Sequence, residues 1–325
     1  MGTVETARGT IDTSRLGATL MHEHVLIESP EYQANYPGDW DEEERVADAV
    51  RRLDDLFAEG ISTIVDLTVL GQGRNVPRVA RIAEATSLNI VVAAGVYVLS
   101  DLPFPLRTRG PGSPLGGGGE PLEDLLWHDV EVGVAGSGVK AGILKCTTDQ
   151  AGITPDVERA IRAVARVHRA TGVPITTHSH AGTRRGLDQQ DLLEQEGVDL
   201  GRVVIGHSGD TLDLDYLERI LARGSYLGMD RFGIDTMLPF DDRVEVVARL
   251  CQRGHAGRMV LSHDAACHSD WFDQQALAAT LPNWHFRHIS RDVLPALRRQ
   301  GVTEAQLTAM LVDNPRAIFE TSGPY

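Results

Sequence analysis

Short apolar runs alternate along the chain with longer segments in which apolar positions recur at helical spacing. The runs are rich in Val, Ile and Leu and nearly continuous, which is typical of parallel strands buried on both faces. This repeated β-α rhythm favours a closed (β/α)8 barrel. The predicted strands are Gly17–His24, Ile61–Leu67, Ile90–Tyr97, Ala141–Thr147, Pro174–His180, Val203–Ser208, Tyr226–Arg231 and Met259–Asp264.

The segments between the strands carry helix start and stop signals. The Glu42–Glu59 segment repeats apolar residues every three or four positions and ends before Gly60, a typical residue after a helix. Thr303 precedes Gln306 by three positions, which predicts a capping box. Other helices are predicted at Thr154–Ala170, Asp215–Ala222, Asp242–Arg253, Asp292–Gln300 and Thr303–Val312.

An open, doubly wound sheet is the competing α/β architecture. Neither a GxGxxG motif nor a P-loop follows the first predicted strand, which counts against the nucleotide-binding sheets of that class. The sequence shows no linker or composition shift. We therefore expect one (β/α)8-barrel domain over residues 1–325.

Composition and charge narrow the class of partner. The formal net charge of −15 disfavours nucleic acids and anionic membranes, because both reward a basic surface. No apolar run is long enough for a membrane span, and the N-terminus lacks a signal-peptide pattern. The three cysteines show no zinc-binding spacing and fit reduced thiols. We expect a cytoplasmic protein that acts on a small molecule.

Lysine is almost missing from this chain. Lys140 and Lys145 are its two lysines, and the other 29 of the 31 basic residues are arginines. Lys145 lies in the fourth predicted strand, where burial would favour its neutral amine. A neutral amine can add carbon dioxide to form an anionic carbamate able to bridge two cations, whereas arginine stays protonated. The alternatives are chance clustering and an ordinary salt-bridged lysine.

Histidines at strand ends provide the strongest local signal. His22 and His24 alternate with Glu23, so both imidazoles point to the same face of the first strand and could hold one metal ion. His263, next to Asp264, should point the other way, toward the helices. Alone, the pair could also be two unrelated polar residues. The other candidate ligands, however, end further strands at the barrel face where active sites gather: Lys145, His178, His207 and Asp264.

The chain resembles the phosphotriesterase-like lactonases, which belong to the phosphotriesterase family of the amidohydrolase superfamily. The resemblance covers nearly the whole chain, and its motifs follow the same order and strand positions. These motifs are Thr19–His24, Gly142–Lys145, Thr176–His178, Val204–Ser208, Gly228–Arg231, Leu261–Asp264 and Asp313–Arg316.

The resemblance implies a metal-dependent hydrolase with two divalent ions, zinc being the expected metal and cobalt, manganese and iron the alternatives. His22, His24 and Asp264 would bind the more buried ion. His178 and His207 would bind the more exposed ion, and Lys145, as N6-carboxylysine, would bridge the two together with a hydroxide.

The resemblance also implies catalytic roles outside the ligand set. Tyr97 would lie beside the reacting centre, and Arg231 would contact the substrate or its leaving oxygen. Asp264 would accept the proton as hydroxide attacks, and Asp210 would lie behind the ligands, where it could relay a proton.

The implied substrates are lactones, especially N-acyl-homoserine lactones in quorum quenching, with promiscuous phosphotriesterase activity and a homodimeric assembly. The alternatives are a dedicated phosphotriesterase, an amidase or dihydroorotase-like enzyme, and a catalytically silent barrel. Apolar residues after the eighth strand could line a channel for an acyl tail or simply pack the loop: Ala276, Leu277, Ala278, Ala279, Leu281, Trp284 and Phe286.

Overall fold

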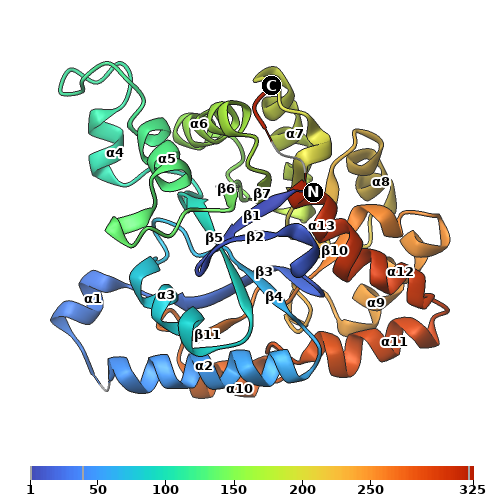
Figure 1. Ribbon diagram of the computed structural model, residues 1–325. Helices are drawn as coiled ribbons and strands as arrows, with labels where there is room; N and C mark the ends of the chain where they lie inside the picture. Colours follow the sequence, from blue (N-terminus) through green and yellow to red (C-terminus); the bar gives the residue numbers. More distant parts are fainter. Residues whose placement is uncertain (1, 39, 321–322) are drawn as a thin grey trace.

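A parallel sheet surrounded by helices forms the centre of the protein in the computed structural model, which describes residues 2–38, 40–320 and 323–325 (Figure 1). Nine strands lie in one sheet in the order β10-β9-β8-β7-β6-β5-β4-β3-β11. The strands are β3 (Thr19–Ile27), β4 (Thr63–Asp66), β5 (Asn89–Gly95), β6 (Ile143–Thr147), β7 (Ile175–His178), β8 (Val203–Ile205), β9 (Tyr226–Met229), β10 (Met259–Leu261) and β11 (Ala266–Ser269).

All eight predicted strands are confirmed, but most end earlier than their apolar runs suggest. Strand β8 ends at Ile205 and β10 at Leu261, whereas the sequence predicted ends at Ser208 and Asp264. His207 and Asp264 both have φ of +57°, in the left-handed region, so the backbone leaves the regular ladder before it reaches them. These two candidate ligands therefore lie at bends just beyond their strands, whereas the other four lie within strands: His22, His24, Lys145 and His178.

Hydrogen bonds link the two ends of the sheet. The Asp264 N–H donates to the His22 carbonyl at 3.0 Å, and the His24 N–H donates to the Ala265 carbonyl at 2.8 Å. Strand β11, which the sequence analysis did not predict, then continues parallel to β3. The chain thus passes from β10 to β11 alongside β3, giving a TIM-like α/β architecture rather than an open doubly wound sheet.

Two apolar cores lie on the two faces of the strands. The inner core contains strand residues such as Met21, Val65 and Val91, and the hairpin residue Val4 and the helix residue Phe319 pack against it. The hairpin, β1 (Thr3–Thr6) and β2 (Gly9–Asp12), was not predicted. It lies beside the C-terminal helix in Figure 1, and together they cover the N-terminal end of the strands. The opposite end is left for the polar site.

The outer core lies between the strands and the helices. Four of the six predicted helices are confirmed with small shifts, and the capping box at Thr303 and Gln306 is present. The α-helices are α1 (Pro30–Asn35), α2 (Glu42–Ala58), α3 (Val76–Ala85), α4 (Phe104–Arg109), α5 (Pro121–Glu131), α6 (Pro155–Thr171), α7 (Arg185–Gln195), α8 (Leu214–Ala222), α9 (Phe240–Gln252), α10 (Gln274–Thr280), α11 (Leu294–Arg299), α12 (Glu304–Thr308) and α13 (Asn314–Glu320).

Two helix predictions need correction. The helix expected at Asp292–Gln300 starts earlier, as a π-helical segment at Ile289–Val293 that continues into α11. The helix expected to end at Val312 continues through a second π-helical segment, Ala309–Asp313, into α13. Within the described ranges, no helix combines the length and apolarity needed to cross a bilayer.

Candidate metal centre

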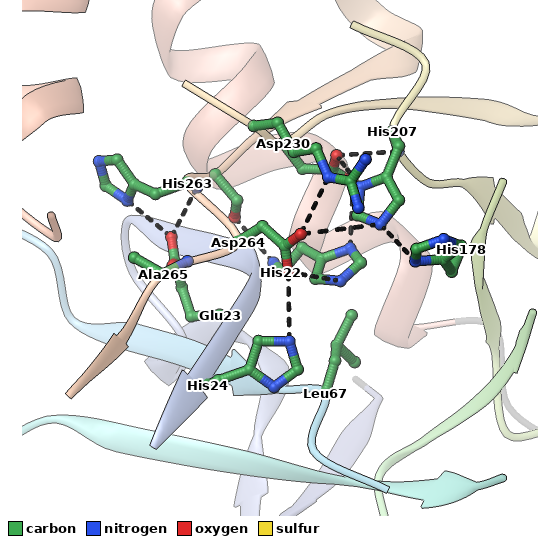
Figure 2. Close-up of polar contacts among 12 residues, drawn as sticks. His22, Glu23, His24, Leu67, His178, His207, Asp230, His263, Asp264 and Ala265 are labelled. Atoms are coloured by element: carbon green, nitrogen blue, oxygen red, sulfur yellow. Dashed lines mark hydrogen bonds and ion pairs between the residues drawn. The ribbon is translucent and has the colours of Figure 1, made fainter. Parts of the chain in front are cut away.

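The candidate ligands from distant strands meet at one mouth of the sheet (Figure 2). Oδ1 of Asp264 lies 3.4 Å from Nε2 of His22 and 3.2 Å from Nε2 of His24. Its other oxygen lies 3.8 Å from Nε2 of His207. Nε2 of His207 in turn lies 2.9 Å from Nδ1 of His178. The structure therefore brings together the four histidines and the aspartate that the sequence singled out.

A carboxylate that the sequence analysis did not select orients two of these imidazoles. Asp230 follows β9 and is 1 % exposed. Its Oδ2 lies 3.0 Å from Nδ1 of His22, and its Oδ1 lies 2.9 Å from Nδ1 of His207. A carboxylate only accepts hydrogen bonds, so both Nδ1 atoms carry the proton and both Nε2 atoms present a lone pair. Asp230 thus orients one predicted ligand of each metal ion, His22 for the more buried ion and His207 for the more exposed ion.

His24 is oriented in the same sense by a hydroxyl. The Thr68 hydroxyl donates to Asp66 at 2.6 Å and lies 2.8 Å from Nδ1 of His24. Because that hydroxyl proton is already used, Thr68 accepts from Nδ1–H of His24, and Nε2 of His24 keeps its lone pair. Three imidazoles thus direct unprotonated Nε2 atoms at the carboxylate of Asp264.

The protonation states suit cation binding. Burial lowers the pKa of His24 and His178 to about 4 and that of His207 to about 3, so these imidazoles are neutral near pH 7. Nε2 of His22 is buried and makes no hydrogen bond within the described part of the chain. Imidazole nitrogens with a free lone pair beside a carboxylate are typical ligands of Zn²⁺ and similar ions. The donor set therefore fits divalent metal.

Lys145 lies beneath this cluster with 1 % exposure. Its Nζ donates to the Leu67 carbonyl at 3.0 Å and lies 5.8 Å from the centre of the Tyr97 ring. Burial lowers the pKa of Lys145 to about 8, so the neutral amine is accessible near pH 7. The alternative prediction for this residue was an ordinary salt-bridged lysine. Its hydrogen-bond partner is instead a neutral backbone carbonyl.

Arg231 connects Asp264 to a second acidic residue. Its Nε donates to Asp264 at 3.0 Å and its Nη1 donates to Asp210 at 3.0 Å. Asp210 also lies 2.7 Å from Nη1 of Arg243, which is 2 % exposed. A guanidinium keeps its protons, so these contacts support Asp210 as the group that holds Arg231. Its role as a proton relay stays a prediction.

A cavity of about 570 Å³ opens above the cluster. Its floor includes Tyr97, Lys145, Arg231 and Asp264. Its walls are mainly apolar: Ile27, Ile234, Met237, Trp271, Phe272, Ala276, Leu277, Leu281 and Trp284. Of the loop residues expected to line a channel, Ala278 and Ala279 do not appear in this wall, and Phe286 is buried in the outer core.

Glu23 and His263 form a second buried pair next to Asp264 (Figure 2), and neither residue lines the cavity. Nδ1 of His263 lies 2.7 Å from Oε1 of Glu23, and both side chains are fully buried. The orientation predicted for His263 is confirmed. Strand alternation does place Glu23 opposite His22 and His24, but its partner lies 240 positions away, which no local pattern shows.

Asp230 was missed for a different reason. It directly precedes Arg231 in the Gly228–Arg231 motif, in which only Arg231 was predicted to have a functional role. A carboxylate at a strand end among candidate histidines is the signal that could have identified it.

Comparison with known proteins places the chain among hydrolases. The model of the phosphotriesterase family matches residues 2–319. A structure described as the phosphotriesterase from Mycobacterium tuberculosis is 58 % identical, with a TM-score of 0.97, and the match covers 99 % of this chain and 100 % of that one.

Two further relatives differ in their names. An aryldialkylphosphatase of Saccharolobus solfataricus is 37 % identical over 96 % of this chain and 98 % of its own length. A mutant of a PTE-like lactonase from Deinococcus radiodurans is 35 % identical, with a TM-score of 0.90, and the match covers 97 % of this chain and 99 % of that chain.

Proposed function

Because this chain belongs to the phosphotriesterase family and is a metal-dependent hydrolase, we propose that it hydrolyses lactones, with N-acyl-homoserine lactones as the substrate class and phosphotriesters as weaker substrates. The observation that carries this proposal is the cavity over the candidate metal centre. Its floor is polar and reactive, whereas its walls are apolar. A lactone with an acyl tail matches this arrangement, because its ring is polar and reactive and its tail is apolar.

The proposed ligands divide into two groups. His22, His24 and Asp264 hold one ion, and these three ligand atoms lie within 4.8 Å of one another. His178 and His207 hold the other. Zinc is the proposed metal, and the two ions would polarise the scissile carbonyl and lower the pKa of a water molecule.

Lys145 completes the ligand set as a carbamate. Its neutral Nζ adds to the carbon of carbon dioxide, forming an N–C bond and releasing one proton. The carbamate nitrogen keeps one N–H, which can maintain the hydrogen bond to the Leu67 carbonyl. The new carboxylate-like group is anionic, as a bridge between two cations requires.

Asp264 is the proposed proton acceptor. It touches three imidazoles and Arg231, yet its side chain remains 15 % exposed and lines the cavity. It can therefore take a proton from an attacking water and return it to the leaving alkoxide. The Arg231 hydrogen bond keeps Asp264 oriented and leaves positive charge near the leaving oxygen.

Tyr97 is proposed to orient the substrate. Its ring meets His178 edge to face at 5.5 Å between centroids, and it lines the cavity floor. Burial raises the pKa of Tyr97 to about 12, so the phenol stays protonated and can donate a hydrogen bond to the lactone.

The whole chain is proposed to act as one (β/α)8-barrel domain over residues 1–325, assembled as a homodimer. Two backbone hydrogen bonds link the sheet ends and support the closed barrel: Asp264 donates to His22, and His24 donates to Ala265. The likeness to relatives over almost their full length supports the domain assignment.

A dedicated phosphotriesterase is the second candidate, favoured by the aryldialkylphosphatase relative. The test is kcat/KM on one metal-loaded preparation for lactones of increasing acyl length and for paraoxon. We expect values that rise with acyl length and exceed the paraoxon value by about 100-fold or more, because apolar tail contacts add binding. A higher value for paraoxon would reject the lactonase proposal.

Substitution of a residue in the cavity wall tests whether the acyl tail binds there. Leu277 lines the cavity, and Leu277→Ser should reduce kcat/KM for the longest lactone by about ten-fold while sparing the shortest. Leu125→Ser, at a 42 % exposed position on α5, is the matched control. Equal losses for short and long lactones in Leu277→Ser would remove the acyl tail from this wall.

A further inference from the structure

We propose that Glu23 is a positioning residue that fixes Asp264 in its ligand geometry by clamping the backbone on both sides of it. The inference rests on the proposed metal site but is independent of the proposed substrate. It concerns a side chain that points away from the cavity and touches neither substrate nor metal.

Both carboxylate oxygens of Glu23 are used on the segment around Asp264. Oε1 accepts from the His263 backbone N–H at 2.9 Å and from the His263 ring at 2.7 Å. Oε2 accepts from the Ala265 backbone N–H at 3.0 Å. A single side chain thus holds the residues before and after Asp264, and the strand it extends from carries His22 and His24.

The segment needs such a clamp because its backbone is strained. Asp264 has φ of +57°, in the left-handed region, which is unfavourable for a non-glycine residue and persists only where the surroundings enforce it. The hydrogen bond from the Asp264 N–H to the His22 carbonyl holds the backbone at Asp264 itself. The Glu23 contacts hold the N–H groups of the residues before and after Asp264, and so help to determine where its carboxylate points.

His263 extends the clamp to the wall of the cavity. Its Nε2 accepts from the Ile289 backbone N–H at 2.9 Å, which agrees with an Nδ1–H that donates to Glu23. Its carbonyl accepts from Nε1 of Trp284 at 2.8 Å, and Trp284 lines the cavity. Glu23, His263 and Trp284 therefore join the ligand strand β3 to the substrate loop.

The first experiment compares Glu23→Gln with Glu28→Gln in the reconstituted full chain. In Glu23→Gln one acceptor oxygen becomes an amide that faces a backbone N–H. We expect metal affinity, measured by chelator competition, to fall about 10- to 100-fold. We also expect the visible absorption of the cobalt-loaded protein to change, and kcat to fall more than KM rises.

Glu28→Gln makes the same chemical change at a 4 % exposed residue paired with Arg78, away from Asp264. It should lower the melting temperature yet leave metal affinity, the cobalt spectrum and kcat close to wild type. The inference fails if Glu23→Gln matches this control in all three measurements. If wild type itself binds no metal, the proposed metal site fails instead.

Two His263 variants decide the question even if Glu23→Gln does not fold. The amide of His263→Asn can occupy the position of Nδ1 and donate to Glu23, whereas the amide of His263→Gln reaches the position of Nε2 and meets Ile289. The clamp predicts higher metal affinity and kcat in His263→Asn than in His263→Gln. The reverse order would overturn it, because the Ile289 contact would then matter more.

Discussion

Neighbouring residues in the Thr19–Ile27 strand contact the Asp264 segment from different faces of the strand: His22 and His24 lie near its carboxylate, and Glu23 binds the backbone on either side. Strand alternation was enough to predict that His22 and His24 face the centre, and the cluster around Asp264 confirms that they meet there. The same rule places Glu23 on the outer face but says nothing of its contact 240 positions away. Strand alternation alone therefore predicted how the two histidines point, whereas the distant contacts of Glu23 and Asp230 do not follow from any local pattern.

Substitution of Lys145 provides the most direct test of the proposed metal site. Lys145→Arg keeps a positive charge but cannot form a carbamate, and it places a permanent cation where two metal ions should lie. We expect loss of both ions and at least a 1000-fold lower kcat/KM, because metal activation of the nucleophile is lost with them. Elemental analysis and the lactone assay measure both effects.

Lys140→Arg is the matched control, since it makes the same change at the other lysine. This variant should retain wild-type metal content and rate. Full metal content together with full activity in Lys145→Arg would contradict the carbamate bridge.

At the scale of elements, strand identity was predictable and strand ends were not. The apolar run beginning at Val203 gives no sign that the ladder stops at Ile205, because the cause is a backbone turn at His207 that serves the site. The hairpin β1–β2 and strand β11 lack long apolar runs. Strands β1 and β2 are short and pair with each other, whereas β11 is defined by its pairing with the distant strand β3. Local patterns carry little information of that kind.

Strand β9 shows how an element makes room for chemistry. A Cβ atom added at Gly228 would lie 2.4 Å from Oδ2 of Asp230 and 3.0 Å from Cα of Gly206. The missing side chain is thus the space that the Asp230 carboxylate occupies. Gly228→Ala should push this carboxylate off the Nδ1 atoms of His22 and His207, lowering metal affinity about 10- to 100-fold.

The comparison is Gly257→Ala, where an added Cβ meets no atom within 4 Å among the described residues. Chelator competition on both variants provides the measurement. We expect the control to bind metal as wild type does. Equal affinity in Gly228→Ala and Gly257→Ala would show that Asp230 is not needed to orient the two histidines.

At the scale of the whole molecule, the proposed ligands tie the sheet together around its circumference. They come from β3, β6, β7, the turn after β8 and the turn after β10, so ion binding requires these strands to be in place. Metal binding to the native state alone stabilises it, by about 2.7 kcal/mol at a free concentration 100 times Kd. Removal of the ions should therefore lower the free energy of unfolding as well as abolish hydrolysis.

We accordingly expect chelated protein to melt about 5–10 °C below the metal-loaded protein, at the same scan rate and concentration. Zinc, cobalt or manganese should restore the melting temperature, whereas calcium should not, because it prefers cages of six or more oxygen ligands and the centre is rich in imidazole. Calorimetry on the chelated and reloaded samples measures this. Equal melting temperatures, with the ions shown to be bound, would contradict this expectation, because the unfolded chain would then have to bind the ions as tightly as the native protein does, without the strands that bring the ligands together.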